Sequence, residues 1–156
     1  MGKDNDIWAT PPEYFEELNK IFNFTTDVCA LPFNTKVKHF YSPDDDGLRQ
    51  DWSGVCWMNP PFSETGKWVE KAFKESEKGT IVIALLPAYI DTSWWHEFVH
   101  KKADFVVPTK RLKFVRYDTQ VTQCNLDGEH LPASKKATSR FGCVIVGWGI
   151  TEVLSR

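Results

Sequence analysis

Apolar and polar positions along the chain follow two periods, one typical of helices and one typical of strands. Helical spacing occurs three times, and we expect helices over about residues 11–22, 64–78 and 92–101. The apolar face of the first should carry Tyr14, Phe15, Leu18, Ile21 and Phe22, with Thr10 as its N-cap. Short apolar runs predict strands near residues 24–30, 54–58, 80–86, 105–107, 112–116 and 141–148, and the polar stretches 34–49 and 117–139 are expected as loops.

Strands that alternate with helices predict an α/β fold with a mixed, mostly parallel sheet and helices on both faces. The run over 80–86 is apolar throughout, which is typical of a strand buried on both sides. No repeat, low-complexity tract or linker divides the chain, so residues 1–156 are expected to form a single domain. Ligands of such folds bind at the carboxyl ends of strands, where residues 27–30, Asn59 and Pro87 are expected to lie.

The segment Asn59-Pro60-Pro61-Phe62 carries the strongest chemical signal. It follows the apolar run over 54–58, at the point where a buried strand should end. Proline fixes φ and donates no backbone hydrogen bond, and the residue before it is held extended. The turn therefore presents an amide, a carbonyl and an aromatic ring together. Such a turn can hold a planar group with an exocyclic amine, because two acceptors take its N–H protons and the ring stacks on its face.

Charge is distributed unevenly along the chain. The net charge is −2, yet residues 1–100 carry 9 basic and 16 acidic side chains whereas residues 101–140 carry 9 basic and 4 acidic ones. A basic segment of this kind is suited to phosphates, and a chance fluctuation is the alternative. Seven tryptophans exceed what a core of this size usually needs, so some are expected to line a stacking surface.

No apolar run is long enough for a membrane span, and the first ten residues do not resemble a signal peptide. We therefore expect a soluble protein of the cytoplasm, without a membrane partner. The four cysteines lie far apart, without zinc-ribbon or redox spacing, and are expected as thiols, three of them in strand-like runs. The oligomeric state is not predicted.

Several short motifs follow one another in a fixed order. They are Trp8-x-Thr10-Pro11, Asp27-Val28-Cys29-Ala30, Gly47-Leu48-x-x-Asp51-Trp52, the Asn59 turn, Trp68-x-x-Lys71-Ala72, Leu85-Leu86-Pro87-Ala88 and Arg111-Leu112-x-Phe114. Together they resemble the phage-type DNA N-6-adenine methyltransferase (Dam) family over about residues 7–146. The resemblance implies a Rossmann-like S-adenosylmethionine-dependent methyltransferase fold, double-stranded DNA as partner, a phage or prophage gene, and methyl transfer to the amine of a flipped adenine.

The same resemblance implies roles for individual residues. The catalytic positions are Asn59, Pro60, Pro61 and Phe62. The cofactor positions are Trp8, Thr10, Pro11, Asp27, Cys29, Ala30, Asp51, Trp52 and Asn59, and an acid in a surface turn is the alternative for Asp51. One of Asp44, Asp45 and Asp46 is a candidate for the ribose hydroxyls, with a solvated acidic turn as the alternative. The glycine-rich loop of many such enzymes is replaced here by Cys29-Ala30-Leu31-Pro32.

Base reading is expected from two loops, 31–50 and 108–140, because the chain has no room for a separate recognition domain. The candidates for DNA contact are the basic residues of the second loop, with solvated surface charge as the alternative for each: Lys110, Arg111, Lys113, Arg116, Lys135, Lys136 and Arg140.

Three other functions stay open. The turn at Asn59 also suits RNA bases or a protein glutamine as methyl acceptor. The sequence His96-Glu97-Phe98-Val99-His100 satisfies the H-E-x-x-H pattern of zinc hydrolases, although only Glu129 and His130 offer a third ligand. We favour the interpretation that these are ordinary helix residues, and we expect no metal site. A DNA-binding module without enzymatic activity is the third alternative.

Overall fold

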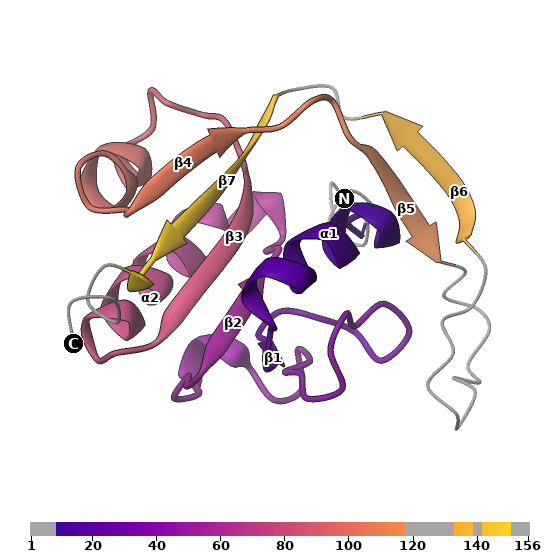
Figure 1. Ribbon diagram of the computed structural model, residues 1–156, viewed down its shortest axis with the longest axis horizontal. Coiled ribbons are helices and arrows are strands. Elements are labelled where there is room, and N and C mark those ends of the chain that lie inside the picture. Colours follow the sequence, from indigo (N-terminus) through magenta and orange to yellow (C-terminus); the bar gives the residue numbers. More distant parts are fainter. Residues whose placement is uncertain (1–8, 118–132, 139–141, 151–156) are drawn as a thin grey trace.

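The computed structural model describes residues 9–117, 133–138 and 142–150, with the backbone alone for 115–117 and 133–138. Figure 1 shows a central twisted sheet with a separate two-stranded ribbon beside it. The predictions for Trp8, Cys124, Glu129, His130 and Arg140 concern residues outside the described ranges.

The main sheet has five strands in the order β1-β2-β3-β7-β4. β1 (Thr26–Asp27), β2 (Val55–Met58) and β3 (Ile81–Pro87) pair in parallel, whereas β7 (Cys143–Trp148) runs antiparallel to both β3 and β4 (Phe105–Pro108). The sheet is therefore mixed, and only β7 points against the other four strands. The expected mixed α/β architecture is confirmed, whereas a Rossmann-like methyltransferase topology stays a prediction.

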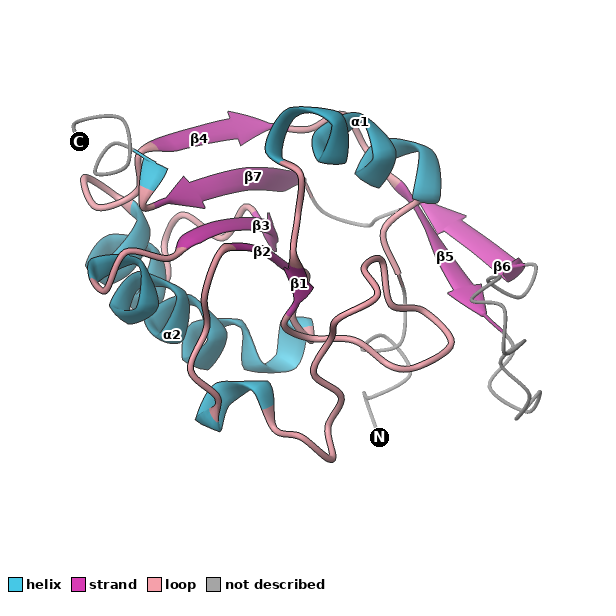
Figure 2. Cartoon of the chain, turned by 60° about the horizontal axis from the view of Figure 1, so that its bottom comes forward, coloured by secondary structure: helices cyan, strands magenta, loops and turns pink. Residues whose placement is uncertain are grey.

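Helices cover both faces of this sheet (Figure 2). On β3, Val82, Ala84 and Leu86 pack in one buried cluster with α2 (Thr65–Glu77) and the short helix η4 (Trp95–Val99). Ile83 and Leu85 point the other way and share a cluster with α1 (Pro12–Phe22). Because successive strand residues face opposite sides, the continuous apolar run over 80–86 supplies both clusters.

α1 attaches to the sheet through an aromatic group. Phe15 is 1% exposed, and its ring lies 5.3 Å from Phe24 and 5.4 Å from Trp57 of β2. Ile21 was expected on this face but is 70% exposed, so that prediction is wrong. The prediction of Thr10 as N-cap is also wrong: Pro11 occupies the cap, and the buried Thr10 side chain bonds elsewhere.

Three elements differ from the sequence-based expectation. The first strand is only two residues long, because the chain bends away after Asp27. The third helix is a five-residue π-helix, in which His100 N–H reaches back to the Trp95 carbonyl at 2.8 Å. Part of the expected loop 117–139 is a strand, β6 (Ala133–Thr138), which pairs antiparallel with β5 (Lys113–Tyr117). The polar sequence of β6 has no apolar alternation, so it gave no strand signal.

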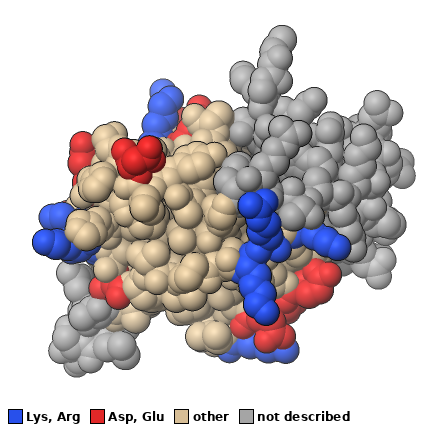
Figure 3. Space-filling model, turned by 90° about the horizontal axis from the view of Figure 1, so that it is seen from above, with Lys and Arg blue, Asp and Glu red and all other residues tan. Residues whose placement is uncertain are grey.

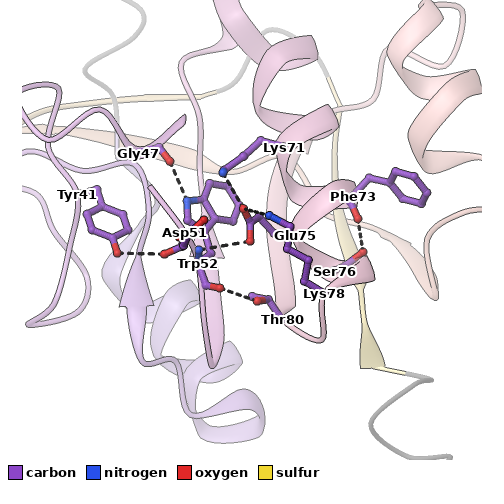
Figure 4. Close-up of polar contacts among 10 residues, drawn as sticks. All are labelled: Tyr41, Gly47, Asp51, Trp52, Lys71, Phe73, Glu75, Ser76, Lys78 and Thr80. Carbon is purple, nitrogen blue, oxygen red and sulfur yellow. Dashed lines mark hydrogen bonds and ion pairs between the residues drawn. The ribbon is translucent and has the colours of Figure 1, made fainter. Parts of the chain in front are cut away.

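A buried carboxylate holds the loop before β2 against α2 (Figure 4). Glu75 is 1% exposed and accepts hydrogen bonds from Lys71 Nζ at 2.7 Å and from the Trp52 backbone N–H at 3.4 Å. The Trp52 indole N–H donates in turn to the Gly47 carbonyl at 2.8 Å, and the Thr80 hydroxyl donates to the Trp52 carbonyl at 2.8 Å. The loop around Trp52 is therefore fixed by polar contacts on three sides.

Replacing this carboxylate should destabilise the fold. Glu75→Ala leaves the Trp52 N–H without its acceptor and Lys71 without its partner, so we expect a loss of about 3 kcal/mol in the free energy of unfolding. Glu70→Ala on the same helix is the matched control, because Glu70 forms an exposed ion pair with Lys74 and should lose less than about 1 kcal/mol. Urea unfolding measures both, and equal losses would contradict the role of Glu75.

Candidate active site

A cavity of about 630 Å³ opens at the carboxyl ends of β1 and β2. The parallel register sets Asp27 of β1 opposite Trp57 of β2, two residues before Asn59. Asp27, Asn59 and Thr10 consequently line the same cavity, together with part of the segment 31–50. The position agrees with the rule that α/β sheets bind ligands at this edge.

The Asn59 side chain is held by a residue 49 positions earlier in the chain. Its Nδ2 donates to the hydroxyl of Thr10 at 2.8 Å, and Thr10 is completely buried. Pro61 also lines the cavity, whereas Pro60 is buried and is not a lining residue. A single-turn 3₁₀ helix, η3 (Phe62–Glu64), follows and leads directly into α2.

Phe62 contacts the base of the two-stranded ribbon rather than the cavity wall. Its ring lies 6.0 Å from that of Phe114 on β5, with the two planes 88° apart. Edge-to-face pairs of this kind are favourable for aromatic rings. The turn that begins at Asn59 is therefore linked through Phe62 to the ribbon.

Asp27 is an acid in an environment that disfavours its charge. It is 2% exposed, and its two carboxylate oxygens accept the backbone N–H groups of Cys29 at 3.3 Å and Lys36 at 3.0 Å. Burial raises the pKa of Asp27 to about 7, although these two hydrogen bonds and the Lys36 charge oppose the rise. Burial likewise lowers the pKa of the half-buried Lys36 to about 8, against the attraction of Asp27.

The structure brings some of the predicted cofactor residues together and leaves others outside. Thr10, Asp27, Cys29, Ala30 and Asn59 all line the cavity. Pro11 instead caps α1 and is not a lining residue.

Asp51 and Trp52 are not brought to the cavity. Asp51 is exposed, and Trp52 is 4% exposed in the core. The Trp52 ring stacks on Trp68 at 6.2 Å with 23° between the planes, and Trp68 does line the cavity. Trp52 therefore supports the wall from behind.

Sequence reasoning missed several wall residues, among them Lys36, Tyr41, Glu64, Lys67 and Trp68. The buried Nε1 of Trp68 has no hydrogen-bond partner within the described part of the chain. The excess of tryptophan was the available signal for Trp68. The other four gave no sequence signal, because residues of these types also occupy ordinary surface positions of loops and helices.

Gly47 forms part of the cavity wall, at a position where no side chain fits. A Cβ at this position would collide with the Val28 carbonyl and lie 3.0 Å from the Trp68 ring. The motif Gly47-Leu48 contained this signal. Among the three acids before it, Asp46 lines the cavity with a left-handed backbone and pairs with Arg49 at 3.3 Å, whereas Asp44 and Asp45 do not line it.

None of the predicted DNA-contact residues that the structure describes lines the cavity. Lys110 and Arg111 are exposed between β4 and β5, and Lys113 is exposed at the start of β5. Figure 3 shows a broad uncharged surface with basic and acidic side chains at its border. Arg116 of β5 is the backbone partner of Lys135 of β6, and Lys136 faces Val115. Six of the seven candidates thus belong to the ribbon or to the segment that leads into it.

The H-E-x-x-H residues belong to η4 and its C-cap, and η4 packs against α2. His96, Glu97 and His100 are exposed, and the two imidazole rings are 6.2 Å apart on the π-helix. Within the described ranges, no group of three or more His, Cys, Asp or Glu side chains could hold a metal ion. In the same ranges, no helix has the length and apolar character to cross a membrane.

An Asn-Pro-Pro-Phe turn beside a large cavity at the strand ends is compatible with the amino-methyltransferase site that the sequence predicts. The model of the family described as DNA N-6-adenine-methyltransferase (Dam) matches residues 1–140. The chain belongs to this family, whose members are adenine-specific DNA methyltransferases.

Three curated relatives agree with that assignment. A DNA N-6-adenine-methyltransferase of Haemophilus phage HP1 is 36% identical over 121 residues, which cover 74% of this chain and 70% of the relative. The protein of the same name from Escherichia phage T1 is 30% identical over 104 residues, 65% of this chain and 44% of the relative. The putative methyltransferase YfdM of Escherichia coli is 32% identical over 65 residues, 36% of this chain and 71% of the relative.

The buried state of Asp27 predicts a pH-dependent stability. Its pKa is raised on folding, so the contribution of Asp27 is greatest below about pH 4 and is lost as the pH rises to about 7. Relative to Asp27→Asn, the wild-type protein should therefore lose up to about 4 kcal/mol in the free energy of unfolding between pH 4 and 7.

Urea unfolding at several pH values below 7 measures this difference, and stopping there avoids the titration of Lys36 near pH 8. Asp44→Asn is the control, because its exposed carboxylate keeps its water on folding. A constant difference between wild type and Asp27→Asn across the range would contradict the burial argument.

Proposed function

We propose that this chain transfers a methyl group from S-adenosylmethionine to the N6 amine of adenine in double-stranded DNA. The observation that carries the proposal is the cavity that Asn59 and Asp27 share at the ends of two parallel strands. One side chain is suited to an amine-bearing base, and the other to a cationic cofactor.

Asn59, which lines the cavity, is suited to accept one proton of the adenine amine. The family resemblance assigns the second proton to the carbonyl of the buried Pro60, which would have to become accessible to the base. With Nδ2 of Asn59 committed to Thr10, its Oδ1 is the atom left to accept a proton. An amine whose two protons are held in this way can pyramidalise, and its lone pair is then aimed at the incoming methyl carbon. Preorganised acceptors of this kind lower the barrier without a strong general base.

The cavity residues fit S-adenosylmethionine, which supplies an electrophilic methyl group when bound. A volume of about 630 Å³ lies within the usual range for cofactor sites. Asp27 would hold the ammonium of the cofactor, and its charge would then be favoured over its neutral form. Gly47 leaves room for close backbone approach, and the unsatisfied Nε1 of Trp68 offers a donor in the wall.

DNA is the polymer that the family and its phage relatives favour, because their names specify DNA adenine. Lys110, Arg111 and Lys113 are suited to phosphate contacts beside the ribbon. Phe62 would stack on the flipped base after moving from its contact with Phe114. The phage origin of two relatives supports a phage or prophage gene that acts in the cytoplasm of a bacterial host.

The Asn59→Ala variant tests the proposed reaction. Loss of the acceptor should lower the transfer rate by about 100- to 1000-fold, while the dissociation constant of S-adenosylmethionine changes less than about threefold. Incubation with radiolabelled donor and mixed DNA, followed by nucleoside analysis, measures the rate and identifies N6-methyladenine.

Asn23→Gly is the matched control, since it removes an exposed amide at the left-handed end of α1 without strain. It should keep the wild-type rate. Retained turnover by Asn59→Ala, or label in RNA or glutamine but not in DNA, would contradict the proposal.

The basic segment should contribute to DNA affinity through phosphates. Lys113→Ala is expected to weaken binding of any duplex and to reduce the slope of log K against log salt by about 1. Lys20→Ala, on the exposed side of α1 next to Glu17, is the control and should leave the slope unchanged. An unchanged slope for Lys113→Ala, measured by fluorescence anisotropy over a salt series, would remove Lys113 from the interface.

A further inference from the structure

We propose that Thr10 is a positioning residue that fixes the Asn59 amide, and that its hydroxyl is not a ligand of the cofactor. The proposal rests on the proposed function and adds to it a second residue that controls the acceptor geometry. The hydrogen bond from Asn59 Nδ2 to Thr10 Oγ1, at 2.8 Å, joins two segments 49 positions apart.

Both ends of this hydrogen bond stand on stiffened backbone. Thr10 precedes Pro11-Pro12, and Asn59 precedes Pro60-Pro61, so each residue is restricted to extended geometry by the proline after it. Pro11 has φ −54° and ψ 131°, and Pro61 has φ −56° and ψ 127°, nearly the same conformation. The distance between the hydroxyl and the amide is thus set by two rigid turns.

A single hydrogen bond matters here because an amide has two chemically different ends. If Nδ2 were released, the Asn59 side chain could turn over and present N–H groups to the target amine, which also carries N–H groups. Thr10 occupies Nδ2 and thereby leaves Oδ1 for the substrate. Thr10 is 0% exposed, so removal of its hydroxyl leaves Nδ2 of Asn59 without its acceptor in the cavity wall.

The variants Thr10→Val and Thr10→Ser separate positioning from cofactor binding. Valine keeps the shape and removes the hydroxyl, so kcat at saturating S-adenosylmethionine should fall about 10- to 100-fold while the cofactor dissociation constant changes less than about threefold. Serine keeps the hydroxyl and should stay within about threefold of the wild-type kcat. In the double variant, Thr10→Val should lower kcat no further than Asn59→Ala does alone, since the two side chains act as one unit.

A wild-type kcat for Thr10→Val would overturn the proposal, and so would a cofactor dissociation constant that rises tenfold with kcat unchanged. A measurement on the unaltered protein covers the case in which Thr10→Val does not fold. By NMR, one side-chain amide proton of Asn59 should exchange slowly with solvent, and rapid exchange of both would overturn the proposal. Failure of the proposed function itself is distinct, because the wild-type protein would then methylate no DNA.

Discussion

The parallel pairing of β1 with β2 is the constraint on which the site depends. Two residues of β1 suffice, because the Val28 N–H continues the ladder by donating to the Trp57 carbonyl at 3.1 Å. Parallel strands end at one edge, so the carboxylate at the end of β1 and the amide just after β2 lie beside the same cavity. Neither side chain is placed by its own sequence neighbours alone.

Around this edge the fold contains two features that are locally unfavourable for stability. Asp27 is buried with a pKa near 7, and Gly47 sits where any Cβ would collide with the Val28 carbonyl. These features are sustained by well-satisfied contacts behind the wall, above all the carboxylate of Glu75 and its bonds to Lys71 and the Trp52 backbone. The stabilising contacts therefore lie in the layer behind the cavity, and the locally unfavourable groups lie in the cavity wall itself.

The periodicity of the chain was enough to predict the central strands, both flanking α-helices and the edge at which Asn59 lies. The periodicity did not predict β6 or the exposure of Ile21, because contacts with other elements, rather than the local sequence, decide both. β6 is a strand because β5 lies beside it, and Ile21 is exposed because the aromatic contacts of Phe15 fix the rotation of α1.

Some of the residues predicted for the site lie together at the cavity, and their roles stay predictions. Thr10, Asp27 and Asn59 converge as expected, since motifs at strand ends share one edge. Asp51 and Trp52 do not, because the side-chain direction of a loop residue depends on contacts such as the one between the Trp52 indole N–H and the Gly47 carbonyl. The wall residues of α2 were missed, because a helix that covers the sheet gives no sign of which turn borders a cavity.

The place of β7 in the sheet bears on the order in which the chain can fold. This strand, formed last along the sequence, inserts between β3 and β4, and β4 has no other partner in the main sheet. The cavity residues described lie between positions 9 and 68, yet the platform beneath them is incomplete until residues 143–148 arrive. During synthesis on the ribosome, the half of the chain that lines the cavity is therefore made before the segment that completes its sheet, and contacts of such long separation are slow to form.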